Sequence, residues 1–140
     1  MTSLQIHFQV DSTVEIEQKL IRQRNGKLLV DIQGKLEILV NGKCFFLEPA
    51  LALLEFGVAL SKWDRMNDFY YYTMEHDERE GPIIAFIHDD RGWRLDSIWR
   101  EFDCEERLPD YTITEAVDYF LANVDGAFMR YYGINTRDFI

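Results

Sequence analysis

The stretch from Pro82 to Cys104 constrains the fold more than any other part of the sequence. Residues 83–87 form a short apolar run of β-branched and aromatic residues, which favour a strand. Residues 89–92, Asp-Asp-Arg-Gly, are typical of a turn, because Asp accepts local backbone hydrogen bonds and Gly adopts positive φ freely. From Trp93 to Arg100 the side chains then alternate with the period of two of a half-buried strand. The stretch predicts a β-hairpin in an antiparallel sheet, with one face in the core and charge on the other.

Alternation of apolar and polar residues also predicts the first strand, at residues 4–10. Residues 14–24 fit both a strand and a short helix, and we favour an extended segment. Asn25-Gly26 is a strong signal for a two-residue hairpin turn, since both residues tolerate positive φ.

A single parity of apolar residues runs through residues 28–40. This pattern predicts one long strand with a bulge or bend at Gly34. Asn41-Gly42 is a second hairpin signal, and residues 43–47 are the returning strand. Aromatic residues and Thr predict a further strand over residues 69–74.

Two amphipathic helices are predicted. Apolar spacing indicates the first over residues 49–66, with Pro49 in its first turn and Gly57 inside it for close contact with the sheet. Thr112-Ile-Thr-Glu115 is a capping box that would begin the second, with Thr112 as N-cap and Gly133 just past its end.

The clean alternation and short turns exclude parallel crossovers. We therefore predict a single α+β domain over residues 1–140, a length that can bury a core without staples. Its architecture is a two-layer sandwich, in which an antiparallel β-sheet of six to seven strands is packed by two amphipathic helices.

The negative charge of the chain is concentrated in its middle. The net charge is −10, yet residues 1–63 hold seven acids and seven bases, whereas residues 64–110 hold fourteen acids and six bases. Such a field repels nucleic acids and anionic membranes, and we expect neither as a partner. It would attract a basic protein. The alternative is that the charge serves solubility alone.

No pattern predicts a catalytic, metal or cofactor site, and we expect no enzyme. His76 lies among acids, but neighbouring side chains on an extended chain point to opposite sides and cannot all bind one metal ion. His88-Asp89-Asp90 resembles the His-Asp pair of metal phosphohydrolases, but here the pair ends a strand. The acidic stretches 75–80 and 101–106 would hold a hard cation only if they meet at one sheet edge. Phosphate loops and nucleophile elbows are absent from the sequence.

The two cysteines, Cys44 and Cys104, form neither a disulfide framework nor a zinc motif. Residues 1–8 lack the basic and apolar regions of a signal peptide. A cytoplasmic location is the resulting expectation.

Tyrosines and tryptophans among carboxylates are typical of a protein interface. The alternative is that these rings fill the core between sheet and helix. The predicted partner-binding residues combine aromatic anchors with acids: Tyr70, Tyr72, Glu75, Asp77, Glu78, Asp89, Asp90, Trp93, Asp96, Trp99, Glu101 and Asp103.

The segments 54–57, 69–76, 82–88 and 93–99 resemble small uncharacterised bacterial proteins of about this length. Some such acidic proteins resemble immunity partners of polymorphic toxins. The resemblance covers the middle half of the chain and carries no catalytic motif, so it assigns no site residues. It implies a cytosolic protein-binding module, and our leading hypothesis is an immunity protein that blocks a basic toxin. The alternatives are a self-associating structural domain, such as a homodimer joined by an aromatic sheet face, and a metal-dependent enzyme.

Overall fold

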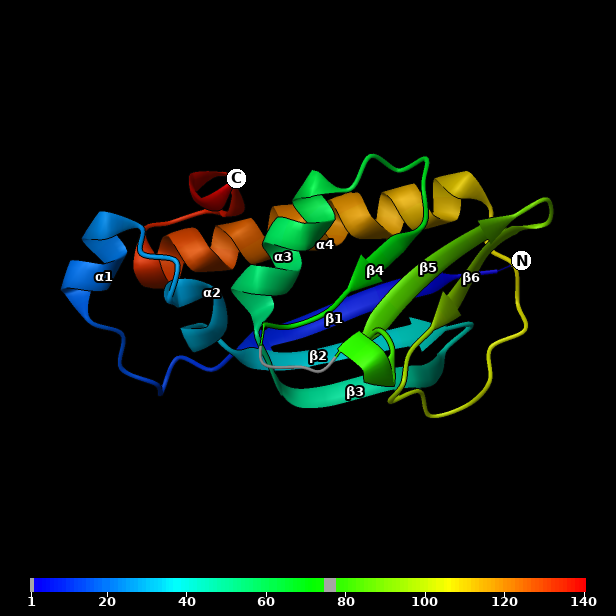
Figure 1. Cartoon of the computed structure of the whole chain (residues 1–140), viewed down its shortest axis with the longest axis horizontal. Helices are drawn as coiled ribbons and strands as arrows, with labels where there is room; N and C mark the ends of the chain where they lie inside the picture. The colour runs from blue at the N-terminus through cyan, green and yellow to red at the C-terminus, as the bar shows by residue number, and fades with distance from the viewer. Residues whose placement is uncertain (1, 75–77) are drawn as a thin grey trace.

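The computed structural model describes residues 2–74 and 78–140, and in that part of the chain six strands form two antiparallel sheets (Figure 1). The first sheet has the order β1-β2-β3, with β1 (Leu4–Val10), β2 (Gly34–Val40) and β3 (Lys43–Leu51). The second has the order β4-β5-β6, with β4 (Phe69–Tyr71), β5 (Ile84–Asp89) and β6 (Gly92–Asp96). The predicted α+β class and antiparallel pairing are confirmed, but the single sheet is wrong, because a buried helix joins the two meanders and packs against strands of both.

That connecting helix is α3 (Leu53–Lys62), and the longest helix, α4 (Asp110–Tyr132), runs along β1 (Figure 1). The shorter helices are α1 (Gln18–Gln23), α2 (Leu28–Asp31) and the 3-10 turns η1 (Glu78–Glu80) and η2 (Thr136–Phe139). Among the residues described, no helix combines the length and the apolar character needed to cross a bilayer.

Within the core, Phe56 joins the second sheet to α3 and α4. Its ring lies 5.1 Å from the ring of Tyr71 in β4 and 5.6 Å from that of Phe120 in α4. The Tyr71 hydroxyl donates a 2.8 Å hydrogen bond to Glu55, and burial raises the pKa of Tyr71, which keeps the donor protonated. Buried side chains of both sheets therefore share one hydrophobic core.

The segment before β2 is helical, not extended. Residues 18–23 form α1 and residues 28–31 form α2, so the strand predicted from residue 28 begins only at Gly34. Leu28 and Ile32 are both fully buried and lie four residues apart, a spacing that fits a helix. The same residues also fit the alternation of a strand, which is why the sequence pattern predicted a strand here. Asn25-Gly26 joins these two helices instead of making a hairpin, and the Asn25 side chain accepts a bond from the Lys27 N–H.

One of the two backbone predictions for this sheet holds. Asn41 and Gly42 have φ of 51° and 80°, as a type I′ hairpin turn requires. The predicted bulge at Gly34 inside a long strand is wrong, because β2 begins at Gly34. The register shift between Gly34 and Leu36 places the extra residue in β3, where Glu48 to Leu51 spans three residues against two in β2.

The bounds of the two predicted helices were partly wrong. β3 continues to Leu51 and α3 begins at Leu53, so Pro49 lies in an edge strand, where its missing N–H is tolerated. A Cβ on Gly57 would lie 3.0 Å from Thr136, so its close neighbour is η2 and not the sheet.

The last helix begins at Asp110 with Pro109 as N-cap, which places Thr112 inside the helix and not at its cap. Gly133, with φ of 69°, caps the C-terminus as predicted.

The predicted strands of the second sheet are shorter than the pattern suggested. β4 ends at Tyr71, three residues before Met74. β6 ends at Asp96, because the Ser97 hydroxyl accepts a bond from the Trp99 N–H and turns the chain. The predicted hairpin itself, β5 and β6 joined at residues 90–91, is confirmed.

Candidate functional site

The predicted aromatic anchors lie in different environments. Trp93 is 2% exposed, its ring is 5.3 Å from that of Trp63, and its indole N–H donates to Asp110. It is a core residue, so the prediction of Trp93 as a surface anchor is wrong. Tyr70 and Trp99 are about half exposed, and Tyr72 is half-buried.

Arginines engage half of the predicted acids that the structure describes. Asp89 accepts a 2.9 Å bond from Arg107. Asp96 and Asp103 lie 3.6 Å and 2.6 Å from the guanidinium of Arg100. The remaining predicted acids are exposed and make no ion pair with a described residue: Glu78, Asp90 and Glu101. Glu75 and Asp77 lie outside the described residues.

The Asp89 carboxylate makes the acid stability of the hairpin testable. The Arg91 backbone N–H and the Arg107 guanidinium hold the pKa of Asp89 below its ordinary value of 3.8. Because the pKa of Asp89 is lower in the folded chain than in the unfolded chain, its carboxylate stabilises the fold at pH values above the ordinary pKa. That stabilisation is lost as the pH falls through the pKa of the folded state. We expect Asp89→Asn to be less stable than the wild type at neutral pH and to lose less stability on acidification below 3.8. Urea unfolding over a pH series checks this, and parallel curves for the two proteins would contradict it.

The described residues offer little for metal or thiol chemistry. They contain no group of three or more His, Cys, Asp or Glu side chains placed to hold a metal ion. Cys44 and Cys104 are both free thiols, and burial raises the pKa of each, which disfavours the nucleophilic thiolate. His88 lies 3.7 Å from Asp110 instead of joining the neighbouring acids in a cluster.

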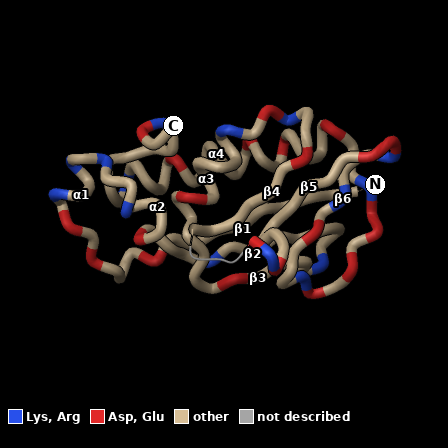
Figure 2. Tube along the Cα trace, in the orientation of Figure 1, with Lys and Arg blue, Asp and Glu red and all other residues tan. Residues whose placement is uncertain are grey.

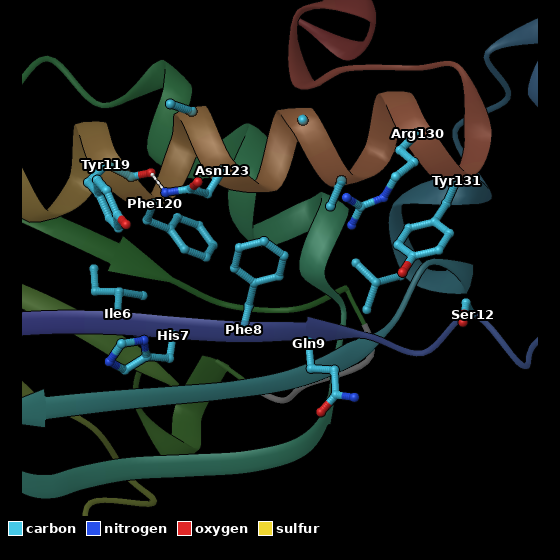
Figure 3. Close-up of a pocket in the computed structure, with 14 residues that line it drawn as sticks. Ile6, His7, Phe8, Gln9, Ser12, Tyr119, Phe120, Asn123, Arg130 and Tyr131 are labelled. Carbon is cyan, nitrogen blue, oxygen red and sulfur yellow. Dashed lines mark hydrogen bonds between the residues drawn. The ribbon is translucent and has the colours of Figure 1, made fainter.

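A groove runs along the edge of β1 beside α4, and Figure 3 shows one of its two parts. It consists of two adjoining hollows of about 640 Å³ and 610 Å³, which share Ile6, His7 and Tyr119. Figure 3 shows the side chains of Ile6 and Phe8 directed from β1 toward the helix. The Phe8 ring meets Phe120 edge-on at 5.7 Å and forms part of the floor.

One wall of the groove is a free strand edge. Among the described strands, β1 pairs with β2 alone. The Ser3 carbonyl accepts a bond from Asn41, and the Asp11 N–H donates to Gln33, so odd-numbered residues direct their backbone groups to β2. The N–H and C=O groups of the even-numbered residues therefore face the other edge: Leu4, Ile6, Phe8 and Val10. Such an edge can accept the main chain of another polypeptide.

The other wall is the outer face of α4, which is unusually rich in exposed apolar surface. Tyr111, Tyr119 and Tyr131 line the groove and are 65%, 72% and 47% exposed. Across both hollows the charged side chains are Glu115 and Arg130, together with the titratable His7. The groove is thus nearly neutral in a chain of net charge −10.

The prediction from sequence missed this groove entirely. A signal was present, because Tyr111 and Tyr119 lie off the apolar face of the last helix. Large apolar residues on the polar side of an amphipathic helix indicate a second contact surface.

A family model described as Domain of unknown function (DUF7878) matches residues 6–129. The chain belongs to this family. The matched part of the DUF7878 chain contains most of β1 and α4, so both walls of the groove lie within the family domain. The prediction of an uncharacterised family is confirmed. Comparison with curated proteins and with solved structures gives no match.

Proposed function

We propose that this chain is a protein-binding module and that the groove between β1 and α4 is its binding surface. The observation that carries the proposal is the pairing of a free strand edge with an exposed aromatic helix face across one groove. The strand edge supplies backbone donors and acceptors, and the helix supplies side chains that suit interface anchors. Both are features of polypeptide recognition and neither needs a catalytic group.

The electrostatics of the groove also favour a protein partner. A contact surface loses affinity when charges are desolvated without partners. The groove limits this cost because Glu115 and Arg130 are its two charged residues and both are exposed. Tyr119 and Tyr131 add rings that pack without desolvating a charge.

A second candidate is the one predicted from composition, an acidic surface that binds a basic protein, as an immunity protein would bind a toxin. The observation that favours it is the connection from β6 to α4, which carries red segments in Figure 2. Residues 96–106 hold five acids and one base, and Trp99 beside them is 44% exposed. Asp96 and Asp103 are held by Arg100, which leaves Glu101, Glu105 and Glu106 as the carboxylates most open to a partner.

One selection experiment tests both surfaces. Random peptides displayed on phage are selected on sparsely immobilised wild-type protein, and the enriched peptides are measured against two variants. Gly126→Trp fills the groove, since a Cβ there meets nothing within 4 Å. Glu101→Gln, Glu105→Gln and Glu106→Gln together neutralise the acidic connection.

We expect the enriched peptides to lose at least about tenfold in affinity for Gly126→Trp and to bind the neutralised variant unchanged. Lysine- and arginine-rich peptides that fail on the neutralised variant, with salt-sensitive binding, would favour the second candidate. The groove is not the binding surface if no enriched peptide distinguishes Gly126→Trp from the wild type.

A further inference from the structure

The groove face of α4 has a pattern that identifies one partner. Six of its residues lie on one exposed stripe, because their spacings of one, three and four residues match the helical repeat. In chain order they are Glu115, Tyr119, Ala122, Asn123, Gly126 and Arg130. The stripe thus contains one acid, one base, one large ring and one glycine.

Read in the reverse direction along the helix, these residues present side chains that complement the original order. When two copies of α4 pack antiparallel about a two-fold axis, residues equally distant from the axis face each other. With the axis between Ala122 and Asn123, Glu115 of one copy faces Arg130 of the other. The same axis places Tyr119 opposite Gly126, and every contact occurs twice.

The charges on the stripe are available for such pairing. Glu115 and Arg130 are exposed and form no ion pair with any residue in the described part of the chain. Arg130 instead lies over the ring of Tyr131, 5.0 Å from its centroid. The neighbouring acid on α4, Asp118, is already held by Arg65 at 2.8 Å.

Gly126 supplies a second, steric argument. Glycine inside a helix is less favourable than alanine, and a Cβ at Gly126 would meet nothing within 4 Å. Packing within the chain therefore gives no reason for glycine at this position. A missing side chain does let the exposed Tyr119 ring of a facing helix approach the backbone closely.

We propose that the partner in the groove is a second copy of this chain, with α4 packed antiparallel on α4 about an axis between Ala122 and Asn123. This inference rests on the proposed function, because it names the occupant of the same groove. Because this face is nearly neutral, two chains of net charge −10 can meet there without a repulsive excess of acids in the contact.

Charge exchange between two variants tests the dimer. We expect the wild type to sediment as a dimer at micromolar concentration. Glu115→Arg puts arginine opposite Arg130, and Arg130→Glu puts glutamate opposite Glu115, so each variant alone should dimerise at least about tenfold more weakly. An equimolar mixture of the two should recover a heterodimer, because each new charge then faces its opposite. The double variant E115R/R130E should recover the homodimer for the same reason.

Two controls separate the interface from other effects. Glu105→Arg makes the same change in net charge as Glu115→Arg but lies on the acidic connection, so it should leave the dimer intact. Gly126→Leu should abolish the dimer while the chain keeps its circular dichroism spectrum and its cooperative unfolding.

Three results would overturn the second-copy assignment: a monomeric wild type, single variants that stay dimeric, or a mixture that does not associate. A monomeric wild type that still selects peptides lost on Gly126→Trp would refute only the second copy and leave the groove as a binding surface. Absence of both association and peptide selection would remove the proposed function as well.

Discussion

Replacing Trp93 with alanine is expected to lower the free energy of unfolding by about 3–5 kcal/mol. The side chain is almost fully buried, and its ring contacts the rings of Trp63 and His88 at centroid distances of 5.3 Å and 4.6 Å. Removing it leaves a cavity and also strips the Asp110 carboxylate of the indole donor. Urea denaturation followed by circular dichroism measures the loss, with the denaturant slope confirming that the same surface unfolds.

Tyr119→Ala is the matched control for an aromatic residue at the surface. Tyr119 is 72% exposed and lies on the outer side of α4, so its removal should change the free energy of unfolding of the monomer by no more than about 0.5 kcal/mol. The comparison is made in the Glu115→Arg background to keep dimerisation out of the measurement. If Trp93→Ala lowers the free energy of unfolding as little as Tyr119→Ala does, the Trp93 ring lies at the surface and is again a candidate anchor.

Trp93 also shows how far a strand pattern predicts function. Alternation correctly groups Trp93 with Leu95 on one face of β6, and both are buried. It does not say which face a helix or another sheet covers, because that depends on segments distant in the sequence. Here Trp63, just after α3, closes over Trp93.

Local patterns predicted the regular elements best. The strict alternation of β1 and the Asn-Gly turn after β2 are confirmed, because each depends on neighbouring residues alone. The region of α1 and α2 was predicted wrongly, since helices of six and four residues are too short to show a helical period. Tertiary contacts decide such segments, as the fully buried Leu28 and Ile32 show.

The groove could not be predicted in the same way. It exists because β1 is at the edge of its sheet and because α4, a hundred residues later in the chain, lies along that edge. Either element alone predicts an ordinary strand or helix. Only their placement turns the off-face tyrosines of α4 and the free backbone groups of β1 into two walls of one surface.

Replacing Gly34 with alanine is expected to destabilise the chain by about 3 kcal/mol, the upper part of the range for overpacking. A Cβ on Gly34 would meet the Gln9 carbonyl oxygen and lie 2.9 Å from the Cα of Val10. These are backbone atoms, so rotation of a side chain cannot relieve the clash, whereas Leu53 at 2.6 Å could move. The C-terminal end of β1 must therefore separate from β2.

That separation gives the substitution a local signature. Amide hydrogen exchange should become faster at Gln9 and at Asp11, whose N–H donates to Gln33. The amides of β5 and β6 should change only by the amount that the loss of global stability predicts. Gly26→Ala is the control, because a Cβ there meets nothing within 4 Å and should stabilise the chain by about 0.4–1 kcal/mol. If Gly34→Ala proves as stable as this control, β1 does not pack as tightly on β2 as the register requires. If Gly34→Ala also weakens association through α4, the strand edge and the helix act as one binding surface, because Phe8 of β1 packs on Phe120 of α4.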